Sequence, residues 1–141
     1  MVTVAPRVLV INIFNNDPPK GYTPVETMQN VALLCDFAKA DFPDIKIFCM
    51  SAAPGPKRNG KVDYFTRARD EFDILLEDYC SHKDYITFVN QRGWDMFYAS
   101  EEDRANGIIR EDIYADDKVH FNQAGYDLYK EYFKQMLDEY L

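Results

Sequence analysis

The stretch R-V-L-V-I-N-I-F-N-N-D, residues 7–17, sets the frame for the rest of the chain. Its first eight residues are mostly apolar and β-branched, a pattern typical of a strand that is buried on both faces of a parallel sheet. T-P-V-E follows at residues 23–26 as a capping box with proline at the first helical position, so we expect a helix to begin there. A strand followed at once by a helix is typical of the opening of an α/β protein.

Strands and helices alternate along the remaining sequence, which predicts a parallel sheet with right-handed crossovers and helices on its faces, in a single domain over residues 1–141. The expected strands are 7–14, 45–50 and 85–89, and the expected helices are 24–42, 63–79, a short one near 94–102, and one from 123 onward. Apolar residues three and four positions apart mark the covering face of the long helices. These residues are Met28, Val31, Cys35, Ala38 and Phe42, then Phe65, Ala68, Phe72, Leu75 and Tyr79, and finally Tyr126, Tyr129, Phe133, Met136 and Tyr140.

The composition supports a folded core and argues against several partners. Of the 141 residues, 47% are apolar and 28% are charged, as in an ordinary globular domain. The net charge of -8 opposes binding to nucleic acid and to anionic lipid. The opening segment is too short and too polar to span a membrane, so we expect the chain as given to be cytoplasmic unless a signal peptide precedes Met1. Cys35, Cys49 and Cys80 are widely spaced and are interpreted as reduced packing thiols.

One of the two histidines, His120, lies three residues after Asp117 in D-D-K-V-H-F-N-Q-A-G-Y, residues 116–126. A carboxylate at this spacing can accept the Nδ1 proton of the imidazole, which fixes the tautomer that leaves Nε2 free as a general base. Two alternatives stay open: Asp117 as one member of a solvated acidic run, and a metal site, which the lack of a second histidine nearby disfavours. Asn122 is expected to be the N-cap of the last helix.

Asn16 ends the first strand in F-N-N-D, residues 14–17. Ligands of parallel α/β sheets bind beyond the carboxyl ends of the strands, which is where this asparagine would lie. Its side-chain amide would suit the stabilisation of an oxyanion in acyl transfer. The alternative is that Asn16 and Asp17 only make a turn before Pro18.

Three segments together resemble conserved blocks of the SGNH, or GDSL-type, hydrolases. V-L-V-I-N-I-F-N-N-D (8–17) resembles the third block, D-K-V-H-F-N-Q-A-G-Y (117–126) resembles the fifth, and P-D-I-K-I-F-C-M-S-A-A-P-G-P (43–56) is similar to the strand and proline-rich loop between them. The resemblance implies a flavodoxin-like, three-layer α/β/α fold and a serine esterase that acts through an acyl-enzyme on a small or carbohydrate ester, without a cofactor or metal. It implies that His120 is the general base, Asp117 orients it, and Asn16 donates to the oxyanion, with Asn122 in support.

The chain departs from the family pattern in two places. Phe14 stands where the third block has glycine, and we expect its bulk to narrow the site or to shift Asn16. The family's Gly-Asp-Ser strand, which carries the nucleophile, has no counterpart, and the serines present are Ser51, Ser81 and Ser100. Ser51 is the one that would lie near the carboxyl edge of the sheet, but it falls in a loop without a catalytic role in the family. We therefore expect a domain that is incomplete at its N-terminus, with the nucleophile encoded upstream.

The alternative function is a non-catalytic remnant of this fold that serves binding or assembly, and a partner chain that supplies the serine is a further alternative. Without a preceding central strand, the strand at 7–14 would have an unpaired edge, so we expect the isolated chain to be unstable or to form a homo-oligomer through that edge. The aromatic residues Trp94, Phe97 and Tyr98 are interpreted as core, with a sugar or acyl pocket as the alternative.

Overall fold

The structure is a computed structural model that describes residues 5–138. The chain divides into two compact units, which we call the sheet unit (5–53 and 62–91) and the turn unit (54–61 and 92–138). The sheet unit contains the strands and two long helices. The turn unit contains the candidate base His120 and its orienting carboxylate Asp117. Within residues 5–138, no helix is long and apolar enough to cross a lipid bilayer.

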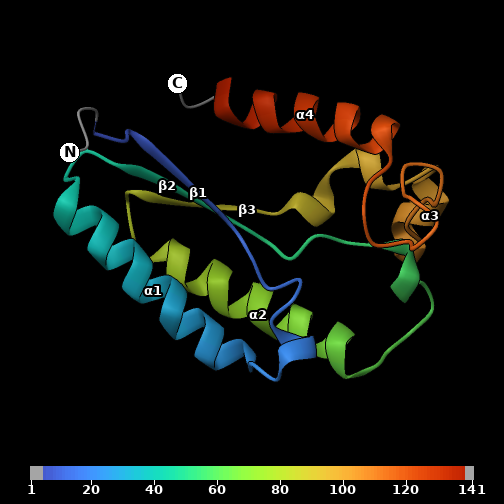
Figure 1. Ribbon diagram of the computed structural model, residues 1–141, viewed down its shortest axis with the longest axis horizontal. Coiled ribbons are helices and arrows are strands. Elements are labelled where there is room, and N and C mark those ends of the chain that lie inside the picture. The colour runs from blue at the N-terminus through green and yellow to red at the C-terminus, as the bar shows by residue number, and fades with distance from the viewer. Residues whose placement is uncertain (1–4, 139–141) are drawn as a thin grey trace. The chain divides into compact units, whose positions relative to one another are not determined.

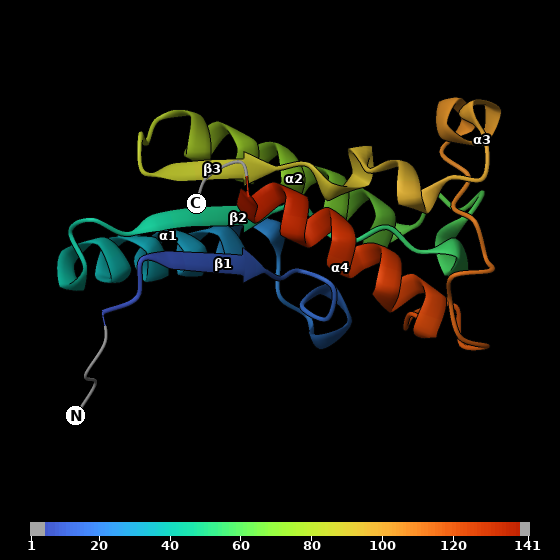
Figure 2. The ribbon, with the colours of Figure 1, turned by 90° about the horizontal axis from the view of Figure 1, so that it is seen from above.

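The sheet unit is built on a parallel sheet of three strands in the order β1-β2-β3, seen from above in Figure 2. β1 is Val8–Asn12, β2 is Lys46–Met50 and β3 is Ile86–Val89. Both pairings are parallel, and Val10 of β1 lies beside Phe48 of β2. The predicted parallel sheet is confirmed, although each strand is shorter than predicted.

β1 is less buried than the sequence indicated. We expected burial on both faces, but Val8, Leu9 and Val10 are only half-buried. The reason is that β1 is an edge strand, because β2 is its one partner among the described residues. The strand carries no charged side chain, and charge is one of the usual protections of an edge against association.

Helices α1 (Pro24–Asp41) and α2 (Tyr64–Ser81) lie side by side on one face of this sheet (Figure 1). The predicted capping box of α1 is present: the Glu26 amide donates to Thr23 Oγ1 at 3.2 Å, and the Thr23 amide donates to Glu26 Oε2 at 2.9 Å. In α2 the most buried row differs from the predicted one, because Leu75 and Tyr79 are only half-buried. The buried residues of α2, four positions apart, are Ala68, Phe72, Leu76 and Cys80.

The core of the sheet unit lies between the sheet and these two helices. The fully buried rings of Phe14 and Phe72 stack at its centre, with centroids 4.3 Å apart. All three cysteines are buried and free, as the interpretation as packing thiols predicted. Contacts with the thiols of Cys35 and Cys80, together with burial, raise the pKa of Cys49, so Cys49 remains a protonated packing group.

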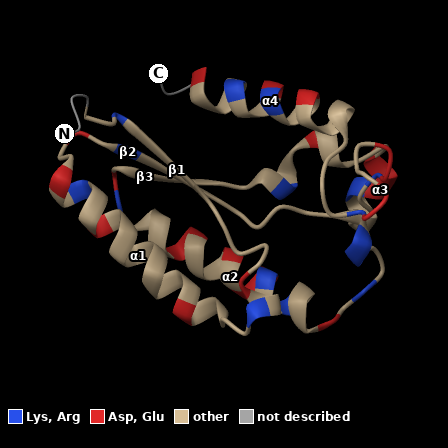
Figure 3. Cartoon of the chain, in the orientation of Figure 1, with Lys and Arg blue, Asp and Glu red and all other residues tan. Residues whose placement is uncertain are grey.

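The turn unit consists of short elements followed by one long helix, α4 (Gln123–Asp138). The single short helix predicted near 94–102 is wrong: a 3-10 turn at Asp95–Phe97 is followed by a separate helix α3, Glu101–Asn106. The break occurs because Ser100 is extended and caps α3, accepting a hydrogen bond from the Asp103 amide. Figure 3 shows acidic and basic residues together along α4, whereas the strands are almost free of charge.

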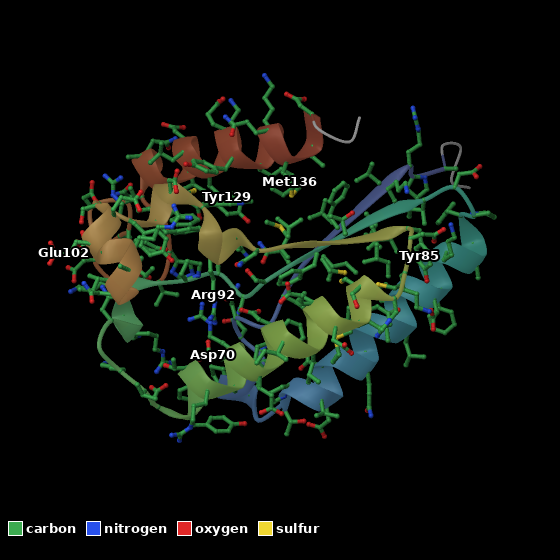
Figure 4. The ribbon with its side chains drawn as sticks, turned by 180° about the vertical axis from the view of Figure 1, so that it is seen from behind. Asp70, Tyr85, Arg92, Glu102, Tyr129 and Met136 are labelled. Atoms are coloured by element: carbon green, nitrogen blue, oxygen red, sulfur yellow. The ribbon has the colours of Figure 1, made fainter. Side chains whose placement is uncertain are left out.

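An aromatic cluster forms the core of the turn unit. The Tyr129 ring, labelled in Figure 4, lies 5.5 Å from the Trp94 ring and 5.4 Å from the Phe121 ring. The buried members of the cluster are Met96, Phe97, Ile109, Ile113 and Tyr114. Phe97 is a buried core residue, as interpreted from the sequence, and Trp94 and Tyr98 are partly buried and pack against this core. Tyr126 is 54% exposed and does not belong to the buried face predicted for α4, and Tyr140 lies outside the described residues.

Candidate active site

Asp117 and His120 are in direct contact in the turn unit. His120 Nδ1 donates to Asp117 Oδ2 across 2.6 Å. The other carboxylate oxygen, Oδ1, accepts hydrogen bonds from the backbone amides of Val119 at 2.9 Å and His120 at 3.0 Å. The side chains of His120 and Asp117 are 73% and 49% exposed. One carboxylate thus holds both the ring and the backbone of this histidine, while the ring remains open to solvent.

The charge state of Asp117 follows from these contacts. The hydrogen bond from the His120 side chain, followed by those from the two backbone amides, holds the pKa of Asp117 well below its usual range. Asp117 is therefore a carboxylate throughout the neutral range. A carboxylate on Nδ1 leaves Nε2 as the free ring nitrogen and stabilises the imidazolium after protonation. This arrangement can accept and return a proton at Nε2.

The loop that carries this pair is closed by a short antiparallel bridge between Tyr114 and Phe121. The Ala115 amide donates to the His120 carbonyl at 2.8 Å, next to this bridge. Lys118, at the tip of the loop, has a positive φ of 56° in the left-handed region, which tightens the turn. Its ammonium group pairs with Glu111 at 2.9 Å. The pair is thus presented by a hairpin-like turn, a feature that the sequence did not predict.

Asn122 follows the bridge and begins α4. Its Oδ1 accepts a hydrogen bond from the Gly125 amide at 3.0 Å, so the predicted N-cap is confirmed. Its Nδ2 donates to the carbonyls of Asp112 at 2.7 Å and Tyr114 at 3.2 Å, which the sequence did not indicate. Gly125 is required by close approach, because a Cβ there would lie 2.2 Å from the Ile113 carbonyl oxygen.

The two alternatives for the acidic run can be compared with these contacts. Asp112 forms an ion pair with Arg110, whose side chain lowers the pKa of this carboxyl group. Asp117 is bound by His120 and by backbone amides, so it is more than one charge on a solvated face. Among the described residues, no group of three or more His, Cys, Asp or Glu side chains is arranged to hold a metal ion.

Asn16 lies in the sheet unit, exposed in a turn four residues past the end of β1 rather than at the end of the strand as expected. The turn is fixed on both sides of it, because the Phe14 amide donates to Asp17 Oδ2 at 3.1 Å. Phe14 has a positive φ of 75°, a conformation that glycine adopts at little cost. Its side chain packs into the core against Phe72. The expectation that its bulk narrows the site is therefore wrong, because the ring lies in the core. The alternative expectation, a shift of Asn16, stays a prediction.

Two of the three serines make structural hydrogen bonds, and the third is buried. Ser81 Oγ donates to the Asp78 carbonyl at 2.7 Å, and Ser100 caps α3. Ser51 follows β2 at the carboxyl edge of the sheet, as expected, but is only 1% exposed. Gln91, which sequence reasoning missed, is fully buried at the same edge and donates to the Ser51 carbonyl and, at 3.1 Å, to Asn12 Oδ1. A polar side chain two residues after the end of a β-strand was the available signal for Gln91.

Comparison with known protein families identifies the family of the chain. Residues 1–128 match the GDSL-like Lipase/Acylhydrolase family, so the chain belongs to this family of hydrolases. With its parallel sheet, the chain has the α/β, flavodoxin-like fold of that family. No curated protein matches the chain.

Proposed function

We propose that this chain provides the general-base half of a serine esterase site, acting on a small or carbohydrate ester. The hydrogen bond between His120 Nδ1 and the Asp117 carboxylate is the observation that carries the proposal. It supports a base because Nε2 stays free on a ring that is 73% exposed. Asn16, exposed after β1, is the proposed oxyanion donor.

In the proposed reaction, His120 Nε2 removes the proton from a serine hydroxyl as the serine oxygen attacks the ester carbonyl carbon. The Asp117 carboxylate stabilises the resulting imidazolium. Collapse of the tetrahedral intermediate breaks the bond to the alcohol oxygen, which takes the proton from Nε2. Water, deprotonated by the same nitrogen, then releases the acid from the acyl-enzyme and restores the serine.

We further propose that the nucleophilic serine lies outside these 141 residues, in a strand ending in Gly-Asp-Ser. Burial of Ser51 and the structural hydrogen bonds of Ser81 and Ser100 support this. Reading the frame upstream of Met1 in the native transcript tests it directly. We expect the Gly-Asp-Ser codons in frame upstream of Met1. An in-frame stop codon upstream, with translation starting at Met1, would contradict the proposal.

The catalytic roles are tested in the longer protein by hydrolysis of p-nitrophenyl acetate. His120→Ala should lower kcat/KM by about two to four orders of magnitude, the usual contribution of a general base. His82→Ala is the matched control, because His82 is 71% exposed and also lies beside an aspartate, Asp78. Equal rates for the two variants would remove His120 from the mechanism.

A serine-directed fluorophosphonate separates the nucleophile from the base. The 141-residue chain should remain unlabelled, and the longer protein should be labelled at the upstream serine. Labelling of Ser51, Ser81 or Ser100 that disappears in His120→Ala would place the nucleophile within this chain. That result would contradict the location proposed for the serine while leaving the base role of His120 intact.

A second proposed function, assembly without catalysis, is favoured by one observation, the uncharged edge of β1. The unpaired backbone groups of an edge strand can pair with the same strand of another molecule. Light scattering of the isolated chain should then show self-association, and Val10→Lys should reduce it by placing a charge on the edge. A stable, monodisperse wild-type monomer would contradict this function.

A further inference from the structure

Asn122 joins three segments of the turn unit through one side chain. Nδ2 donates to the carbonyls of Asp112 and Tyr114, and Oδ1 accepts from the Gly125 amide. Capping α4 requires only the oxygen, which a serine or aspartate also provides. The two donations from Nδ2 are additional, because a cap residue without an amide group lacks these donors.

The close approach of α4 to the hairpin makes this bridging geometry available. The Asn122 amide donates to the Ile113 carbonyl at 3.1 Å. A Cβ on Gly125 would collide with that same carbonyl oxygen and would lie 2.9 Å from the Phe121 ring. The first turn of α4 therefore rests directly on the incoming arm of the hairpin, and the Asn122 side chain fastens the two together.

The loop held at its base by these bonds is residues 115–120, which carries the candidate base and its carboxylate. Asp116, Asp117, Lys118, Val119 and His120 are all exposed, so little packing holds the loop in place. The loop depends instead on hydrogen bonds at its ends, including that from the Ala115 amide to the His120 carbonyl. The ends of the loop are the place where Asn122 acts.

We infer that Asn122 is a positioning residue, whose amide clamp on the carbonyls of Asp112 and Tyr114 holds His120 against Asp117. The catalytic meaning of this inference rests on the proposed function. The structural part of the inference is independent of that function, because the predicted change in the His120 ring and amide is measured without turnover.

Asn122→Ser separates the clamp from the cap. Serine caps a helix about as well as asparagine, so α4 should persist, but both Nδ2 donors are lost. We expect hydrogen exchange of the His120 amide to accelerate about tenfold, as for the loss of one or two ordinary hydrogen bonds. The His120 ring, followed by proton–nitrogen NMR, should change from a single tautomer with the proton on Nδ1 to a mixture.

The matched control is Asn106→Ser, because the Asn106 side chain also donates to a backbone carbonyl, that of Glu102 in α3. This variant should leave the exchange rate and the tautomer of His120 unchanged. If Asn122→Ser also leaves both unchanged, Asn122 is a helix cap only and the inference is wrong.

A measurement on the wild-type chain keeps the inference testable if Asn122→Ser does not fold. In native-state exchange at increasing urea, the amides of His120 and Asn122 should open together as one unit. Independent, easier opening of the His120 amide would contradict the clamp. If the His120 amide opens independently but turnover still depends on His120, the inference is wrong and the proposed function stands. If Asn122 holds the loop but the longer protein shows no turnover, the inference stands and the proposed function is wrong.

Discussion

The sheet unit and the turn unit are each stabilised by different kinds of interaction. The sheet unit has a continuous apolar core between its sheet and two long helices, with the stacked rings of Phe14 and Phe72 at its centre. The turn unit has short elements, an aromatic cluster, and many hydrogen bonds between side chains and backbone. Apolar packing therefore dominates the sheet unit, whereas local polar contacts fix the exposed side chains of Asp117 and His120 in the turn unit.

The two histidines, one in each unit, differ in how the neighbouring aspartate is held. His82, at the end of α2 in the sheet unit, lies 3.7 Å from Asp78. His120, in the turn unit, lies 2.6 Å from Asp117, which also binds two backbone amides. The exposed fractions of the two histidine side chains are nearly equal, at 71% and 73%. The two pairs therefore differ in how the aspartate is held, because backbone amides of the turn fix the Asp117 carboxylate.

The largest expected effect on stability is in the core of the sheet unit. Phe72→Ala should lower the free energy of unfolding by about 3–5 kcal/mol, because it removes a fully buried ring from its stack with Phe14. Ile74→Ala is the control on the same helix, since Ile74 is 68% exposed and should change stability by less than about 0.5 kcal/mol. Urea unfolding measures both, and equal losses would break the distinction between scaffold and surface.

A smaller effect is expected at Gln91, a large polar side chain that is fully buried near the carboxyl ends of the strands. Gln91→Leu removes the donor to the Ser51 carbonyl and should cost about 1–3 kcal/mol. Gln123→Leu is the control, because the exposed Gln123 bonds only across one turn of α4 to Asp127. A Gln91→Leu variant as stable as wild type in urea would show that apolar packing alone holds the strand ends.

The smallest effect is the pH dependence of the turn. The folded pKa of Asp117 lies below its ordinary value of about 3.9, so its stabilising contribution is complete above that value and is lost as the pH falls through the folded pKa. Exchange of the Val119 and His120 amides should therefore accelerate below about pH 4, relative to the intrinsic rate. Asp117→Asn should abolish this dependence and Asp116→Asn should retain it. The reverse pattern would assign the titration to Asp116.

The sequence predicted the sheet unit well because burial imposes a period. The spacing of Met28, Val31 and Cys35 marked the face of α1, and T-P-V-E located its first turn. Phe14 was misjudged because a sequence shows the size of a side chain but not a positive φ, which turns this ring into the core.

The turn unit was harder to predict because the residues that make its contacts do not recur at a regular spacing in the sequence. Asp117 and His120 were found together through their spacing and the family resemblance. Asn122 was expected as a helix cap and, from the resemblance, in support of the site, but without the contacts that it makes. Its bonds to the carbonyls of Asp112 and Tyr114 join residues ten and eight positions away. Side-chain hydrogen bonds of this kind form only when the hairpin has folded and brought the two carbonyls near Asn122.

The contact between Asp117 and His120 is tested most directly by nitrogen NMR of the two histidine rings at pH 8, in the wild type and in Asp117→Asn. In the wild type, we predict that His120 carries its proton on Nδ1 in a single tautomer, while His82 is a mixture. Asp117→Asn should make the His120 spectrum resemble that of His82. A wild-type His120 ring that already resembles His82 would contradict the account of an oriented general base.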